Sequence, residues 1–386
     1  MERKRILIVV DPIPTTYSVQ FDLVKSLSAQ IVREFDVYLS TNFIDSKKAT
    51  ELEYLGIRVL RKKEKRRYSF IKKILFPRLN ESLLWGVNWF LDLLAFKLGK
   101  NAIIKFPNIF DYVVNLSSTA MCESDLLWIQ GPPFAEVVES MASNNYLSRL
   151  FLKFFKKPLE NGSRLSVTRM ASLSRVVIAN SRFVASRYKG YPFRIDSVIY
   201  TSKEFSQFMP INILTEEKYV LTYIGKETDL IALEWLLESG IKLKAFGAKI
   251  PPGFNLSRFK NKLSLLGYVS QNQLVQLYSC AHFVAFPFTN EPFGYVPIES
   301  MLCGTPVLSY DKEGPSETIL DGITGWLVKS REEFIEKALQ IWRSESTGIA
   351  KEECIKRGKE FTTEYAVNEL LSLLNHWSIN EINSYN

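Results

Sequence analysis

The fold of this chain is constrained most by one pattern, in which short runs rich in Val, Ile and Leu alternate with longer amphipathic segments. Short β-branched runs followed by helical spacing are typical of βα units around a parallel sheet. In the first half we expect strands at residues 5–10, 35–39, 56–60, 112–116, 126–129 and 175–179. A helix is expected over 19–31, and Ser181 stands where it would cap another.

The same alternation resumes after a less regular stretch at 192–210. Here the expected strands are 219–224, 242–246, 263–268, 283–286, 306–309 and 325–328, with helices near 229–238, 271–280, 296–302 and 332–343. The sequence therefore predicts an α/β fold with two doubly wound, Rossmann-like domains, 1–200 and 201–362, and a C-terminal helix in 363–386 that packs back on the first domain. Open sheets of this kind bind ligands beyond the carboxyl ends of their strands, so we expect the site in a cleft between the domains.

The charge is distributed unevenly along the chain. The first 200 residues hold 31 basic and 18 acidic residues, and the remaining 186 hold 18 basic and 23 acidic residues. A basic half indicates an anionic partner: nucleic acid, an anionic lipid surface or a phosphorylated substrate. No nucleic-acid-binding motif accompanies the charge, which argues against the first of these. The four scattered cysteines lack metal-site spacing and are expected to be reduced thiols.

Neither a signal peptide nor a membrane-spanning helix is expected. The apolar run at 6–10 is too short for a signal-peptide core. The most apolar longer stretch, 83–96, is interrupted by Asn88 and Asp92 and is shorter than the roughly 20 residues that span a bilayer. We therefore expect a cytoplasmic chain.

Residues 286–328 contain the most informative motif. Glu291 and Glu299 are eight positions apart, and the turn residues Pro292 to Gly294 separate them. A helix that begins near Gly294 would present backbone N–H groups and its positive dipole end to an anion such as a diphosphate. Glu299 would then lie close enough to bind a ribose, and Glu291 the hydroxyls of a sugar. The alternative is a buried helix–strand unit with incidental carboxylates.

This segment resembles the E-x7-E segment of the retaining glycosyltransferases of family 4, which have the two-domain GT-B fold. The likeness continues through residues 304–307, 314–317 and 322–327, and weaker likenesses occur at 179–183 and 266–281. The resemblance implies that Glu291 contacts the donor sugar and that Glu299 holds the ribose. It also implies a wider set of donor-binding residues: Pro292, Phe293, Gly294, Tyr295, Val296 and Val269.

The chain departs from the family pattern at three places. Where the family has Gly-Arg and a later Lys facing the diphosphate, this chain has Gly225 and Lys226 only. The glycine pair of the first loop is replaced by residues that include Thr15 and Thr16, whose amides could line the donor site. The family's first-domain histidine is missing, and Gln130 is the candidate in its place, although an ordinary turn residue fits equally well. Of the two histidines, we expect His282 to be packed rather than catalytic.

Two segments of the basic half mix positive charge with aromatic residues. They are 61–100, whose first 20 residues hold nine basic residues and one acidic residue, and 146–157. Such composition suits an interfacial segment on an anionic membrane, which would make the chain peripheral at the cytoplasmic face. The alternative is a solvated charge run. If the segments do dock on a membrane, the acceptor in the first domain is a lipid-linked saccharide or another glycan.

The resulting hypothesis is a retaining, metal-independent hexosyltransferase that uses a nucleotide sugar as substrate and needs no other cofactor. Its catalytic candidates are Glu291 and Gln130. A retaining transfer can run with the leaving diphosphate as the base, so a missing histidine does not exclude it. Two alternatives stay open: another GT-B enzyme such as an epimerase or a phosphorylase, and a non-catalytic protein that binds a nucleotide sugar or a partner.

Overall fold

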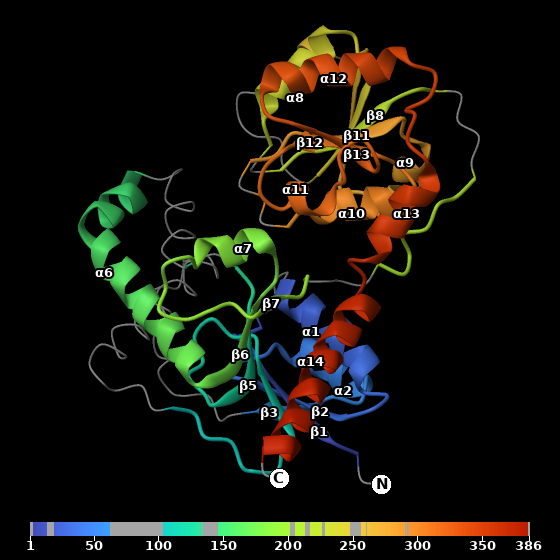
Figure 1. Ribbon diagram of the computed structural model, residues 1–386. Coiled ribbons are helices and arrows are strands. Elements are labelled where there is room, and N and C mark those ends of the chain that lie inside the picture. The colour runs from blue at the N-terminus through green and yellow to red at the C-terminus, as the bar shows by residue number, and fades with distance from the viewer. Residues whose placement is uncertain are drawn as a thin grey trace. The chain divides into compact units, whose positions relative to one another are not determined.

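The computed structural model divides into two compact units, and each is described by itself (Figure 1). The first comprises Met1–Lys203 and Ala366–Asn386, and the second Glu204–Tyr365. The sequence placed these boundaries after residues 200 and 362. The structure describes residues 3–13, 19–61, 103–131, 133, 146–200, 205–212, 217–225, 228–247, 256–259, 261–289, 291 and 293–384.

The first unit is built on a parallel sheet. Its described strands number seven, in the order β3-β2-β1-β4-β5-β6-β7. They are β1 (Arg5–Val9), β2 (Asp36–Thr41), β3 (Arg58–Arg61), β4 (Tyr112–Asn115), β5 (Ser124–Ile129), β6 (Ser174–Ala179) and β7 (Ser197–Val198). The helices in its described residues are α1 (Val19–Ile31), α2 (Ser46–Tyr54), α6 (Tyr146–Ser172), α7 (Arg182–Arg187) and α14 (Thr363–Ser384). The strand order reverses between β1 and β4, as in a doubly wound fold.

A buried carboxylate ties the loops together at this reversal. Asp11 follows β1 and is 5% exposed. It accepts hydrogen bonds from the hydroxyl groups of Ser117 (2.5 Å), Ser118 (2.6 Å) and Thr119 (2.9 Å), which follow β4, and from Gln20 Nε2 (3.2 Å) on α1. Because a buried polar group needs such partners, this network fixes the carboxyl edge of the sheet.

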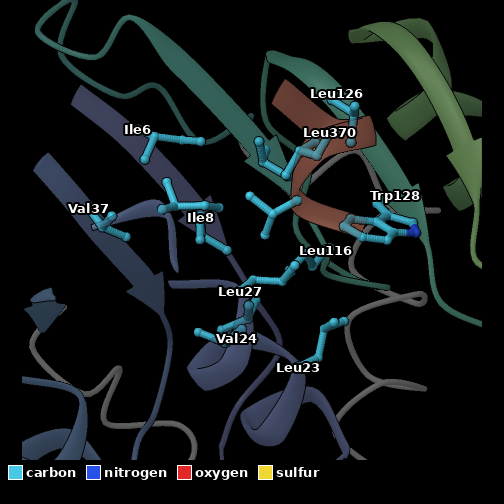
Figure 2. Close-up of a cluster of buried hydrophobic side chains, with 14 of the residues drawn as sticks. Ile6, Ile8, Leu23, Val24, Leu27, Val37, Leu116, Leu126, Trp128 and Leu370 are labelled. Carbon is cyan, nitrogen blue, oxygen red and sulfur yellow. The ribbon is translucent and has the colours of Figure 1, made fainter. Parts of the chain in front are cut away.

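One buried cluster of the first unit lies between the sheet and helices that include α1 and α14, which are far apart in the sequence. Figure 2 shows Ile6 and Ile8 of β1 close to Leu27 of α1 and Leu370 of α14. Helix α14 contributes buried side chains at positions 366, 367, 370 and 374, a spacing that places them on one face of the helix. The last helix is therefore part of this core.

The second unit is also doubly wound. Its sheet has six strands in the described residues, all parallel, in the order β10-β9-β8-β11-β12-β13. They are β8 (Val220–Tyr223), β9 (Leu243–Phe246), β10 (Leu263–Gly267), β11 (Phe283–Phe286), β12 (Val307–Tyr310) and β13 (Gly325–Val328). The order reverses between β8 and β11, so the loops after these two strands border the expected ligand crevice.

The helices of this unit cover both faces of its sheet. They are α8 (Leu230–Glu238), α9 (Gln271–Cys280), α10 (Tyr295–Leu302), α11 (Pro315–Thr318), α12 (Arg331–Arg343) and α13 (Lys351–Lys359), with a 3₁₀ turn at Leu256–Phe259. Helices α8 and α12 lie side by side on one face, and α9, α10 and α13 lie on the other (Figure 1). The two doubly wound sheets confirm the predicted fold class.

None of the helices in the described parts of the chain is both long and apolar enough to cross a membrane. The basic segment 62–100 lies outside the described residues, so its predicted docking role stays a prediction. The second basic segment forms the first part of α6.

Candidate active site

The candidate site is built around the start of α10, at the carboxyl end of β11. Gly294 precedes the helix with φ 86°, a left-handed conformation that glycine adopts without strain. An α-helix has no internal acceptor for the N–H groups of its first turn, and Pro297 has no N–H group. The donors at this end are therefore the N–H groups of Gly294, Tyr295 and Val296, which the helix dipole makes attractive to an anion.

The carboxylate of Glu291 lies at these donors. Its Oε1 accepts hydrogen bonds from the N–H of Gly294 (2.9 Å) and the N–H of Phe293 (3.4 Å). The sequence assigned these amides to a diphosphate and Glu291 to the sugar beyond it. In the structure the Glu291 carboxylate itself accepts the hydrogen bonds of these N–H groups, so a phosphate group and Glu291 would compete for the same donors.

The backbone of Glu291 is held from the turn after β12. Its N–H donates to Oε2 of Glu313 (2.5 Å), and its carbonyl oxygen accepts a hydrogen bond from the N–H of Gly314 (3.0 Å). A Cβ atom on Gly314 would lie 2.4 Å from the backbone of Phe293. Only glycine therefore lets the two loops approach this closely.

The second glutamate of the motif is buried. Glu299, on α10, is 4% exposed, and its Oε2 accepts a hydrogen bond from the hydroxyl of Tyr278 (2.9 Å), on α9. Burial, together with the charge of Glu299, raises the pKa of Tyr278 well above its usual value, so the phenol remains a donor. The rings of Phe208 and Phe246 enclose Tyr278, with centroids 6.2 and 5.9 Å away. Sequence reasoning missed Tyr278, which it placed only near a helix end.

The loop after β8 is fixed beside the loop after β11. The N–H of Asp229 donates to the carbonyl oxygen of Pro287 (2.7 Å), and Thr228 forms a bridge with Phe288. Arg331 binds the Asp229 carboxylate through two nitrogens at 2.9 and 3.1 Å, and Tyr310 donates to it at 2.9 Å.

Burial opposes ionisation of Asp229, but the hydrogen bonds from Arg331 and Tyr310 outweigh it, and the pKa of this carboxyl falls below its usual value. Asp229 therefore stays charged and holds the end of this loop.

Several of the predicted site residues lie elsewhere or outside the described residues. Thr15, Thr16, Lys226 and Pro292 fall outside them. Gln130 belongs to the first unit and lies at the carboxyl end of β5. Its side-chain amide donates to the backbone carbonyl oxygen of Trp128 (3.3 Å), and its backbone carbonyl oxygen accepts a hydrogen bond from the side-chain amide of Asn180 (2.7 Å). Val269 follows the edge strand β10 and is half-buried.

Of the predicted site residues, the structure thus brings together Glu291, Phe293 to Val296 and Glu299, all in the second unit. His282 is packed as expected, with its Nε2 3.0 Å from the carbonyl oxygen of Ile341 and its ring beside Trp342. No three His, Cys, Asp or Glu side chains in the described residues are placed to hold a metal ion.

Comparison with known proteins identifies this part of the chain. Residues 257–361 match the family model described as glycosyl transferases group 1. The chain therefore carries a segment similar to the group 1 glycosyltransferases. This segment begins before β10 and ends after α13, so it contains both glutamates of the motif and the turn that holds Glu291.

Named relatives match parts of the chain. A probable sucrose-phosphate synthase of Thermosipho melanesiensis is 39% identical over 120 residues, which are 30% of this chain and 28% of that protein. The chain thus spans well under half the length of this relative.

Two solved structures share the fold along nearly the whole chain. Anabaena HepE in complex with UDP and glucose has a TM-score of 0.58 at 14% identity and covers 97% of this chain and 100% of its own. The lipopolysaccharide outer core galactosyltransferase WaaB has a TM-score of 0.59 at 12% identity and covers 95% of this chain and 98% of its own. These likenesses show that the chain has the GT-B fold.

Proposed function

We propose that the chain is a retaining glycosyltransferase that transfers a hexose from a nucleotide sugar. One observation supports this most strongly: within the group 1 segment, the Glu291 carboxylate lies on the N–H donors at the start of α10, and the same helix carries Glu299. The neighbouring structure of HepE, in complex with UDP and glucose, supports a uridine diphosphate sugar as the first donor to test.

Donor binding then follows from the chemistry of the helix start. The diphosphate accepts hydrogen bonds from the N–H groups of Gly294, Tyr295 and Val296, because phosphate oxygens are strong acceptors at a helix N-terminus. Displaced from these amides, the Glu291 carboxylate turns to the hydroxyl groups of the sugar. Tyr278 fixes one oxygen of Glu299, which orients this carboxylate toward the ribose hydroxyl groups.

The proposed transfer needs charge stabilisation more than a protein base. The bond between the sugar C1 and the diphosphate oxygen breaks, and a bond from the acceptor oxygen to C1 forms on the same face. The acceptor proton moves to the leaving diphosphate. The helix N–H groups and Lys226 stabilise the negative charge that develops there, and we propose that no metal ion is required.

The proposed acceptor is a lipid-linked saccharide or another glycan at the cytoplasmic membrane face. The mixture of Lys, Arg and aromatic residues in 61–100 and 146–157 supports a peripheral attachment to anionic lipid. The likeness to a galactosyltransferase of the lipopolysaccharide outer core agrees with an acceptor of this kind.

A panel of UDP-glucose, UDP-galactose, UDP-N-acetylglucosamine and GDP-mannose tests the proposal. We expect one donor to raise the midpoint of thermal unfolding and to be hydrolysed slowly, with and without EDTA. NMR of the first sugar released should show that the anomeric configuration is retained. Stabilisation without hydrolysis, even after lipid-linked acceptors are added, would favour the non-catalytic alternative, and no stabilisation by any donor would refute the proposed site.

A further inference from the structure

The turn between β12 and α11 contains a residue in an unusual backbone conformation. Glu313 has φ 54°, and it is the one non-glycine residue with positive φ in the described parts of the chain. Most residues other than glycine disfavour this left-handed region, because their Cβ atom comes too close to a carbonyl oxygen; glycine, and less often asparagine, is found there. A glutamate at this position carries a local conformational cost, which directs attention to its side chain.

The side chain of Glu313 makes one hydrogen bond in the described residues, and its partner is the backbone N–H of Glu291, 2.5 Å from Oε2. The rest of the turn is anchored without this carboxylate. The N–H of Gly314 donates to the Glu291 carbonyl oxygen (3.0 Å), the Ser316 hydroxyl to the Glu313 carbonyl oxygen (2.7 Å), and the N–H of Glu317 to the Gly314 carbonyl oxygen (2.9 Å).

We propose that Glu313 is a positioning residue for Glu291; this inference rests on the proposed function. Glu313 and Gly314 bind the N–H and the carbonyl oxygen of one residue, so together they fix the orientation of both peptide groups that flank Glu291. The Glu291 side chain reaches the N–H of Gly294 from this fixed backbone. Without the Glu313 carboxylate, the loop can rotate and displace the sugar-binding carboxylate by a distance that matters for catalysis.

The test compares Glu313→Gln, Glu313→Gly and a matched control, Asp311→Ala, an exposed residue in the same turn. The substrate is the donor from the panel that the wild type hydrolyses. Gln keeps an acceptor oxygen, so Glu313→Gln should retain kcat within about twofold, whereas Glu313→Gly should lose about tenfold or more. The control should match the wild type.

Two further measurements separate positioning from a merely structural role. Glycine relieves the left-handed conformation and so offsets the lost hydrogen bond to the Glu291 N–H, and Glu313→Gly should leave the midpoint of thermal unfolding nearly unchanged while kcat falls. Its affinity for UDP alone, or for GDP alone if the donor is GDP-mannose, should equal or exceed that of the wild type, because a displaced Glu291 carboxylate leaves the Gly294 N–H open to phosphate.

A double-mutant cycle with Glu291→Gln gives the decisive comparison. If Glu313 acts through Glu291, Glu313→Gly should cost less than about twofold in the Glu291→Gln background. An equal loss in both backgrounds, full activity of Glu313→Gly, or a Glu313→Gln variant as impaired as Glu313→Gly would each overturn the inference. A wild type that hydrolyses no donor of the panel would overturn the proposed function instead, and this inference with it.

Discussion

Replacement of Glu291 by glutamine should change nucleotide binding and sugar turnover in opposite directions. In the structure the carboxylate accepts a hydrogen bond of 2.9 Å from the Gly294 N–H, one of the donors proposed for the diphosphate. A hydrogen bond to a charged acceptor is worth about 1.5–3 kcal/mol, and a neutral one about 0.5–1.5 kcal/mol. A phosphate must displace this contact, and in the glutamine variant the contact is weaker by about 1 kcal/mol.

This difference gives two expected values. The affinity for UDP without a sugar should rise about fivefold in Glu291→Gln, because 1.4 kcal/mol corresponds to tenfold. The weaker contact at the helix start should lower the unfolding free energy by about 1 kcal/mol, a shift of roughly 2–4 °C for a unit of this size. Hydrolysis of the donor should fall, since the sugar hydroxyl groups lose a charged acceptor.

Isothermal titration calorimetry with UDP, then with the intact donor, measures the two affinities separately. GDP replaces UDP if GDP-mannose proves to be the donor. The Asp311→Ala variant is the control for the loss of one negative charge at the same, carboxyl end of the sheet. If Glu291→Gln weakened UDP binding as much as donor binding, the carboxylate would not compete with phosphate for the amides, and the reasoning would be refuted.

Three further predictions test other parts of the structure. Tyr278→Phe removes the hydroxyl that donates to Glu299, so it should raise the donor KM several-fold with little change in kcat and lower the unfolding free energy by about 1–3 kcal/mol in a urea titration. The folded pKa of Asp229 is depressed, so its pairing with Arg331 stabilises the protein above the ordinary Asp pKa, and this stabilisation is lost as the pH falls through the folded pKa. Arg331→Ala should therefore lower the free energy of unfolding at pH 7, and the difference from the wild type should shrink as the pH is lowered below the ordinary Asp pKa. Neutralising the basic residues of 61–67 should weaken binding to anionic vesicles at low salt and spare donor hydrolysis, whereas unchanged vesicle binding would favour a solvated charge run.

The sheets of both units could be predicted because parallel strands are buried on both faces. Runs such as 283–286 are continuously apolar for this reason, and every strand expected from the sequence is present within two residues of its predicted ends. Helix α13 was not expected, because its composition is mostly charged and only Cys354 and Gly358 are buried. The two-residue strand β7 is too short to have a pattern.

The site could be predicted only in outline. The spacing of Glu291 and Glu299 and the glycine before the helix are local features, and they led to the start of α10. Glu291 contacts Glu313, 22 positions away, and Glu299 contacts Tyr278, 21 positions away. No local sequence pattern predicts contacts over such separations. The glutamate at 313 also occupies a turn position where conformational preference favours glycine.

Helix α14 has a consequence for how the chain becomes folded. Its buried residues complete the core of the first unit, yet about 160 residues of the second unit separate it from the strands it covers. During synthesis the second unit is a continuous segment that can fold as soon as it emerges, whereas the first must wait with part of its apolar surface exposed until residues 366–374 are made. The unit that is translated first is therefore the one that finishes folding last, and removal of α14 should damage the first unit while the second still folds.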